Sequence, residues 1–188
     1  MDVSKERITG LIKELSNKQE DVRWAAAFAL ARIGTPAVEG LTKALEDKDS
    51  VVRLRAAWAL GQIGDPRPTD RLILTLRDGD WSVRLRAADA LGKLKAHTAV
   101  DALLLALRDE NADVRRHVIA ALTRIADPAS ADRIGDTLSD PDWRVRMGAA
   151  LALVAIGDER SRKHLQKAAK DENEYVRKIA GMAMKQKQ

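Results

Sequence analysis

The sequence contains no cysteine. This absence excludes disulfide bonds, a thiolate nucleophile and a cysteine-bound metal, and it is typical of a cytoplasmic protein. No apolar run approaches the roughly 18 residues that a membrane span requires, and the charged N-terminus lacks the apolar core of a secretion signal. We therefore expect a cytoplasmic protein without a membrane segment.

Aromatic residues are also scarce, at 3% of the 188 residues, whereas 45% of the residues are hydrophobic. Most of these hydrophobic residues are alanine, leucine, valine and isoleucine, which suit closely packed helices, and signals for β-strands are absent. The formal charge of +5 is compatible with an acidic protein or a nucleic acid as partner. Composition alone therefore predicts an all-α protein but does not choose its partner.

One stretch of sequence recurs along the whole chain. The segment DSVVRLRAAWALGQIGD at 49–65 has close copies, and each copy carries an arginine at the same position. These repeat arginines are Arg23, Arg53, Arg84, Arg115, Arg146 and Arg177, which are 30 residues apart once and 31 apart four times. Such a period indicates stacked units of two elements. We expect a single repeat domain over 1–188, with repeats at about 4–34, 35–65, 66–96, 97–127, 128–158 and 159–188.

Each repeat is predicted to form two helices, which makes the chain an α-solenoid. In the second repeat, the first helix is expected at about 37–46, with Val38, Leu41 and Leu45 on one face. The second helix follows a short turn, and an Asp or Asn stands four residues before the repeat arginine, where its side chain can cap the helix start. The predicted caps are Asp49, Asp80, Asn111, Asp142 and Asn173.

Glycines mark the predicted ends of three second helices, at Gly34, Gly64 and Gly157. Lys95 and Ala126 occupy the same position in the third and fourth repeats, which predicts that the turns there differ. In the sixth repeat, Lys187 stands where other repeats have isoleucine, and Arg162 replaces an apolar residue of the first helix. We expect this last repeat to be a polar cap at the end of the stack.

Positions three, four, seven and ten after the repeat arginine form one stripe on the second helix at 100° per residue. In the second repeat they are Ala56, Ala57, Leu60 and Ile63, and we expect them in the core. The repeat arginine lies at the edge of this stripe and needs a partner, because an unpaired buried charge is strongly destabilising. An aspartate stands six residues before it in five repeats, at Asp47, Asp78, Asp109, Asp140 and Asp171, and Asn17 replaces it in the first. We expect Asp–Arg pairs to form a structural ladder that links each repeat to the next.

The unit VRLRAAWALGQIGD, followed by a second amphipathic helix, resembles the short HEAT-like repeats of the phycobilin-lyase type. The resemblance extends over nearly the whole chain, from about Ser4 to Lys185. It implies an α-solenoid whose second helices line a concave side. It does not fix the function, because such repeats occur in scaffolds, lyase subunits, DNA-repair proteins and hydroxylases.

Signatures of catalysis are missing from the sequence. It contains no Walker motif, GxGxxG, GxSxG or HExxH. His97, His117 and His164 occupy unrelated positions of their repeats, and none of them precedes a glutamate as the iron-binding histidines of related hydroxylases do. We therefore expect no catalytic residue, no metal site, no cofactor and no enzyme that acts alone.

The remaining face of the second helix carries the positions one, two, five and nine after the repeat arginine, and we call it the second-helix face. Seven Lys or Arg and one acid occupy its 24 positions, and aromatic residues cluster in the first two repeats. Large apolar side chains on a rigid surface are common anchors of interfaces. The predicted partner-binding residues are Trp24, Phe28, Arg32, Leu54, Arg55, Trp58, Arg86, Lys93, Arg116, His117, Arg124, Met147 and Leu151.

We interpret this pattern as a non-catalytic protein–protein interaction scaffold that takes an acidic, partly hydrophobic segment in a basic groove. Three alternatives stay open. The apolar patch can join two copies in a homodimer, the basic face can bind nucleic acid through phosphates and stacked bases, or the chain can act as a subunit of a phycobilin-lyase-like complex. Apolar patches interrupt the basic stripe, which favours a protein or peptide partner.

Overall fold

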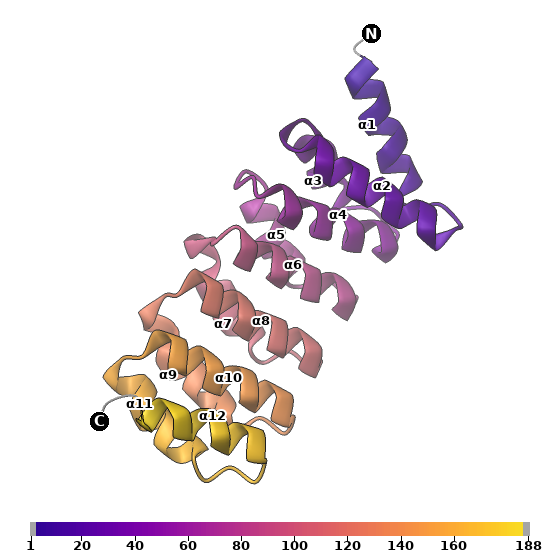
Figure 1. Ribbon diagram of the computed structural model, residues 1–188. Coiled ribbons are helices and arrows are strands. Elements are labelled where there is room, and N and C mark those ends of the chain that lie inside the picture. Colours follow the sequence, from indigo (N-terminus) through magenta and orange to yellow (C-terminus); the bar gives the residue numbers. More distant parts are fainter. Residues whose placement is uncertain (1–2, 186–188) are drawn as a thin grey trace. The chain divides into compact units, whose positions relative to one another are not determined.

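The computed structural model describes residues 3–185, which contain twelve α-helices and no strand (Figure 1). The chain divides into two compact units, one ending at Ala99 and the other beginning at Val100. Each unit holds three pairs of helices, so the predicted all-α solenoid of two-helix repeats is confirmed as the fold class. The expectation of one continuous domain over 1–188 stays a prediction.

In the first unit, the second helices of successive repeats pack against each other, α2 on α4 and α4 on α6. Figure 1 shows these three helices side by side. The first helices α1, α3 and α5 pack beneath their own partners. The helices are α1 (Val3–Glu14), α2 (Glu20–Ile33), α3 (Val38–Ala44), α4 (Ser50–Ile63), α5 (Thr69–Thr75) and α6 (Trp81–Lys93), with short 3₁₀ turns at Thr35–Ala37 and His97–Ala99.

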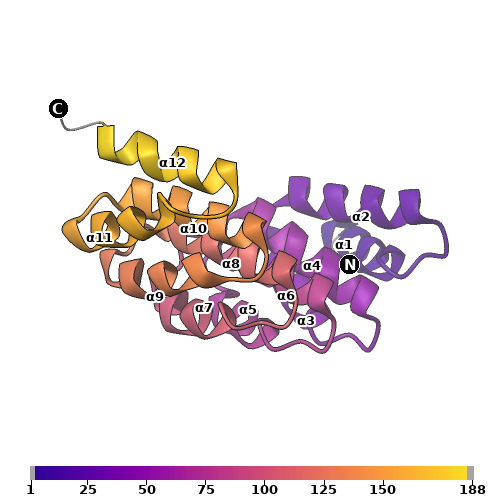
Figure 2. The same cartoon turned by 90° about the horizontal axis from the view of Figure 1, so that it is seen from below.

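The second unit repeats this arrangement, with α8 against α10 and α10 against α12. Figure 2 shows the first helices α9 and α11 in a separate layer from these second helices. The helices are α7 (Val100–Ala106), α8 (Ala112–Ile125), α9 (Ala131–Asp136), α10 (Trp143–Ile156), α11 (Glu159–Ala168) and α12 (Glu174–Lys185), with 3₁₀ turns at Pro128–Ser130 and Thr137–Ser139.

The predicted caps lie at the helix starts. Asp49 accepts a hydrogen bond from the backbone N–H of Val51 at 2.9 Å, and the other four predicted caps make the equivalent contact two residues on. Each contact satisfies a backbone donor that has no partner within the helix. The cap prediction is therefore confirmed. In the first repeat, Gln19 occupies the cap position of α2 without a side-chain hydrogen bond.

The turns after the second helices correct one expectation. The sequence predicts different turns where Lys95 and Ala126 replace glycine. The turn after α6 does differ, since α6 ends at Lys93 and the N–H of Lys95 donates to the carbonyl of Gly92. Both residues nevertheless adopt a positive φ, at 48° and 58°, as Gly64 does at 77°. Ala126 ends α8 in the left-handed conformation, and the N–H of Ala126 donates to the carbonyl of Leu122. The chain therefore keeps the same sense of turn and accepts the steric cost of a Cβ there.

The predicted core stripe is buried. Ala56, Ala57 and Leu60 have no exposed surface, whereas Ile63 is half-buried because α4 ends at that residue. A Cβ placed on Gly61 would lie 2.9 Å from the Cα of Ala90, so the backbones of α4 and α6 approach closely at this point. Small side chains thus set the spacing of the second helices in the first unit.

The repeat arginines join consecutive repeats. Arg53 donates from Nε and Nη2 to the two carboxylate oxygens of Asp78 at 2.6 and 2.8 Å, and its Nη1 donates to the carbonyl of Asp47 at 2.8 Å. Arg115 contacts Asp140, and Arg146 contacts Asp171, in the same two-pronged way. The carboxylate therefore comes from 25 residues ahead, in the next repeat, while the residue six positions back supplies its carbonyl.

The ladder changes at its ends. Arg23 donates to the carbonyls of Asn17 and Lys18, and its buried Nε has no hydrogen-bond partner. Asp47, which the sequence places in the ladder, accepts from the N–H of Asp49 but receives no hydrogen bond from Arg23. Only 24 residues separate Arg23 from Asp47, one fewer than in the formed pairs, so the register of this turn differs.

The other ladder arginines hold the same backbone contacts. Arg84 donates to the carbonyl of Asp78, and Arg177 donates to the carbonyl of Asp171. Asp109 accepts from the N–H of Asn111, as each ladder aspartate does two residues on. Lys187, on which the prediction of a polar cap partly depends, lies outside the described residues. Over 3–185, no helix combines the length and the apolar character needed to cross a membrane.

Candidate partner-binding face

In the first unit, three aromatic side chains of the second-helix face form one cluster. The rings of Trp24 and Trp58 meet edge to face with centroids 5.4 Å apart, and Phe28 lies 4.7 Å from Trp58. These rings come from α2 and α4, which pack against each other. Phe28 keeps 55% of its surface exposed, and the two tryptophans are half-buried. The cluster is a rigid apolar surface with one open ring.

Arg55 does not lie where the sequence predicts. The expectation puts it on the open face, but its side chain is buried, with 4% of its surface exposed. Its guanidinium lies 4.7 Å from the centre of the Trp24 ring, and its Nη1 donates to the carbonyl of Val51. The reason is the neighbouring repeat, because Trp24 of α2 covers the arginine by a cation–π contact. Arg55 therefore supports the aromatic cluster and is not available to a partner.

Several basic side chains belong to the same face as this cluster. Arg32 and Lys93 occupy the same position of their helices, and both are exposed, while Arg86 is half-buried and lies 3.8 Å from Asp89. The amide of Gln62, turned with its oxygen toward the two donors, accepts from Nε1 of Trp58 at 3.3 Å and from Nζ of Lys93 at 2.5 Å. Leu54 is half-buried. The first unit thus combines an apolar patch with exposed basic groups.

In the second unit, the second-helix face contains an open hollow of about 370 Å³ between α8 and α10. Ile119, Met147 and Leu151 give it an apolar floor, and Leu151 is 50% exposed. Arginines stand around this floor, at Arg116, Arg124 and Arg144. The hollow therefore offers an apolar contact surrounded by guanidinium groups, which suit carboxylates because they present several N–H donors in one plane.

Two carboxylates share the rim with the arginines. Asp113 lies 3.2 Å from Arg116 and 3.8 Å from Arg144, and Asp142 accepts from Arg144 at 2.7 Å. The hydrogen bonds that Arg144 donates lower the pKa of Asp142 to about 2. Three arginines and two acids therefore surround the hollow. His117, which also belongs to α8, is half-buried.

Part of this site was not among the residues predicted from the sequence. Arg144 was missed because it precedes the repeat arginine, and Ile119 and Thr123 also line the hollow. Arg144 stands seven residues before Leu151, two helical turns away, which puts both side chains on the same face. That spacing could have identified it. Of the predicted residues, Arg116, Arg124, Met147 and Leu151 meet in the hollow.

The histidines do not converge. His164 lies 3.2 Å from Asp132, and within 3–185 no three His, Asp or Glu side chains are placed to hold a metal ion. The candidate site is built by the variable positions of stacked helices. An α-solenoid with such a face belongs to the class of helical-repeat proteins whose extended surfaces bind partners.

Comparison with protein families names the class more closely. The profile of HEAT repeats matches residues 8–74 and 100–185, and that of the PBS lyase HEAT-like repeat matches residues 83–109. Since the first match spans most of the sequence, the chain belongs to the HEAT-repeat family, a fold typical of protein-interaction scaffolds. A search of curated proteins finds no significant match.

Solved structures share the fold. The CpcE–CpcF complex of phycocyanin lyase from Nostoc sp. PCC7120 is 26% identical with a TM-score of 0.68, over 92% of this chain and 74% of that chain. YibA of Escherichia coli is 24% identical with a TM-score of 0.77, over 96% and 72%. A designed armadillo repeat protein in complex with the peptide (KR)4 is 19% identical with a TM-score of 0.64, over 94% and 98%. The last two likenesses concern the fold alone.

Proposed function

We propose that this chain is a non-catalytic scaffold that binds an acidic, partly hydrophobic segment of another protein on its second-helix face. The observation that carries the proposal is the hollow between α8 and α10, where Arg116, Arg124 and Arg144 surround an apolar floor. An apolar side chain of the partner would enter the hollow, and carboxylates beside it would pair with the rim. A mixed apolar and charged contact of this kind gives both affinity and specificity.

The first unit supports a second contact for the same partner class. Exposed Phe28 stands on the tryptophan cluster, and exposed Arg32 and Lys93 belong to the same face. Aromatic and arginine side chains are enriched among the residues that dominate binding energy at interfaces. A homodimer through this patch is the competing occupant, and the oligomeric state of the purified protein tests it.

Two other functions have less support. Nucleic acid would need an uninterrupted basic track, whereas Asp113 and Asp142 lie among the arginines of the rim. A role as one subunit of a lyase-like complex agrees with the CpcE–CpcF neighbour, whose structure contains two different chains. Such a role would still use a protein partner, so the same surface would be required.

The test is a peptide titration. A fluorescent peptide of alternating glutamate and leucine pairs is titrated with the full chain, and its anisotropy is compared with that of a lysine–leucine peptide and of single-stranded DNA. We expect the acidic peptide to bind best. Leu151→Glu should weaken its binding by about tenfold or more, because a carboxylate would replace an apolar contact in the hollow.

Leu105→Glu is the matched control. Leu105 lies on the first helix α7 and is 61% exposed, close to the exposure of Leu151, but it is not part of the second-helix face. Its substitution should leave the peptide affinity unchanged. Equal binding by wild type and Leu151→Glu would reject the hollow as the site. Preference for DNA, with an affinity that falls steeply as salt rises, would favour the nucleic-acid alternative.

A further inference from the structure

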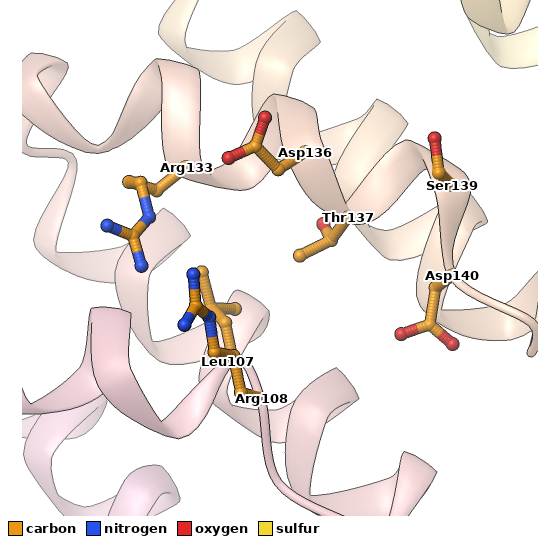
Figure 3. Close-up of a pocket in the computed structure, with 7 residues that line it drawn as sticks. All are labelled: Leu107, Arg108, Arg133, Asp136, Thr137, Ser139 and Asp140. Carbon is orange, nitrogen blue, oxygen red and sulfur yellow. The ribbon is translucent and has the colours of Figure 1, made fainter.

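A second pocket of the second unit lies away from the second-helix face. It has a volume of about 210 Å³ and is lined by the turn after α7 and by α9 with its following 3₁₀ turn. Figure 3 shows the guanidinium groups of Arg108 and Arg133 at the same end of this pocket, which Asp136 also lines. Two like charges therefore face the same space.

Neither guanidinium group makes a hydrogen bond or an ion pair within the described residues. Asp140 also lines the pocket. Its carboxylate accepts hydrogen bonds from Nε and Nη2 of Arg115 and from the N–H of Asp142, so it does not neutralise Arg108 or Arg133. Both arginines are exposed. Two guanidinium groups held close together repel each other unless an anion lies between them.

One interface of the first unit shows an acid–base pair at this position. Glu46, on the turn after α3, forms an ion pair with Arg71 of α5. Arg108 and Arg133 stand 62 residues after Glu46 and Arg71, which is two full repeats, so they are the equivalent residues of the second unit. The acid of the first pair has become an arginine in the second. The second pair thus has two guanidinium groups where the first is neutral, and Asp136 is the one carboxylate of the pocket that is not engaged by another arginine.

We propose that Arg108 and Arg133 bind a phosphate group. A carboxylate brings one negative charge and would neutralise one arginine, as Glu46 does for Arg71. A phosphate brings about two charges and several acceptor oxygens, so it balances both guanidinium groups and accepts hydrogen bonds from each. The hydroxyl of Ser139 lies at the other end of the pocket, where the molecule that carries the phosphate would extend. This site is independent of the proposed peptide-binding face.

The test is the melting temperature in sodium phosphate against sodium chloride of the same ionic strength. For the wild type, phosphate at ten times its Kd should raise the Tm by about 3 °C or more. Arg108→Glu places an acid opposite Arg133, as Glu46 is opposite Arg71. This variant should lose the rise in Tm with phosphate, and in chloride it should melt at a higher temperature than the wild type. Arg133→Glu should lose the rise as well. Titration with phosphoserine and with acetate separates a phosphate ester from free phosphate and from a carboxylate.

Lys170→Glu provides the control, because Lys170 occupies the position of Arg108 in the last repeat and is exposed. This variant should respond to phosphate as the wild type does. An equal rise in Tm for wild type, Arg108→Glu and Arg133→Glu would overturn the site, and so would the absence of any rise in the wild type. Stabilisation by acetate as strong as that by phosphate would overturn the assignment of the ligand.

Discussion

At the scale of single residues, Asp142 has two roles. It caps α10 by accepting from the N–H of Arg144, and it accepts from the guanidinium of the same arginine at the rim of the hollow. The hydrogen bonds from Arg144 favour the ionised carboxylate and lower the pKa of Asp142 from 3.8 to about 2. The folded state therefore binds a proton at this site less readily than the unfolded chain.

This difference predicts a pH dependence of stability. Because the folded pKa is depressed, the stabilising contribution is complete above about pH 4 and is lost as pH falls through about 2. Asp142→Asn keeps a cap, as Asn111 does in α8, but cannot ionise. Urea unfolding should show the variant less stable by about 1 kcal/mol at pH 6, after allowance for solvent screening, and equal to the wild type near pH 2. A difference that persists at pH 2 would contradict this origin.

Ala126 shows a residue kept in an unfavourable backbone conformation. Its φ of 58° lies in the left-handed region, where a Cβ approaches the following carbonyl. Ala126→Gly should therefore stabilise the protein by about 1 kcal/mol. Gly64→Ala is the reverse change at the same repeat position, where φ is 77°, and should destabilise by a similar amount. Opposite shifts of the two urea midpoints would support the account, and shifts of the same sign would refute it.

At the scale of elements, the contact between α4 and α6 limits side-chain size. Gly61 faces the backbone of Ala90, and its own Cβ would be too close for the helices to keep their separation. Gly61→Ala should therefore destabilise the chain by about 1–3 kcal/mol through overpacking. Gly10→Ala is the matched control, since Gly10 lies inside α1 with open space around it. It should stabilise by about 0.5–1 kcal/mol, because alanine favours the helix. Thermal unfolding distinguishes the two signs.

The elements were the most predictable part of the molecule. Repetition shows which residues are constrained, so the caps, the alanine stripe and the helix pairs follow from local chemistry that recurs every 31 residues. The partner of each repeat arginine was harder to predict. Asp47 is six residues from Arg53 in sequence, but the carboxylate that Arg53 binds belongs to Asp78, because stacking brings the next turn alongside. The separation of two residues in the sequence does not show which of them stacking brings into contact.

The candidate site was only partly predictable, for the same reason. Helix geometry placed Met147 and Leu151 on the second-helix face, where the hollow lies. Helix geometry also placed Arg55 on this face, but its side chain is buried because Trp24 of the neighbouring repeat covers it. The geometry of one helix identifies an outward position, but burial depends on the size of the side chain across the interface.

At the scale of the whole molecule, the recurring residues build the solenoid and the variable ones give it a surface. The repeat arginines and the alanine stripe occur in both units, whereas the aromatic cluster belongs to the first and the arginine-rimmed hollow to the second. We therefore expect that recognition can be changed without loss of the fold. Arg124 and Arg144 are exposed and Arg116 is half-buried, so substitution of these arginines should cost little stability beyond the loss of the Arg144–Asp142 pair.

The most direct test reverses the charge of the rim. Arg116→Glu, Arg124→Glu and Arg144→Glu are combined in one variant, its helical content is verified by circular dichroism, and its affinities for the acidic and the basic leucine peptides are measured. We predict that the affinity of the variant for the acidic peptide falls at least tenfold and that its affinity for the basic peptide rises, because charge complementarity selects the partner. A folded variant that still prefers the acidic peptide would contradict the assignment of the second-helix face as the binding surface.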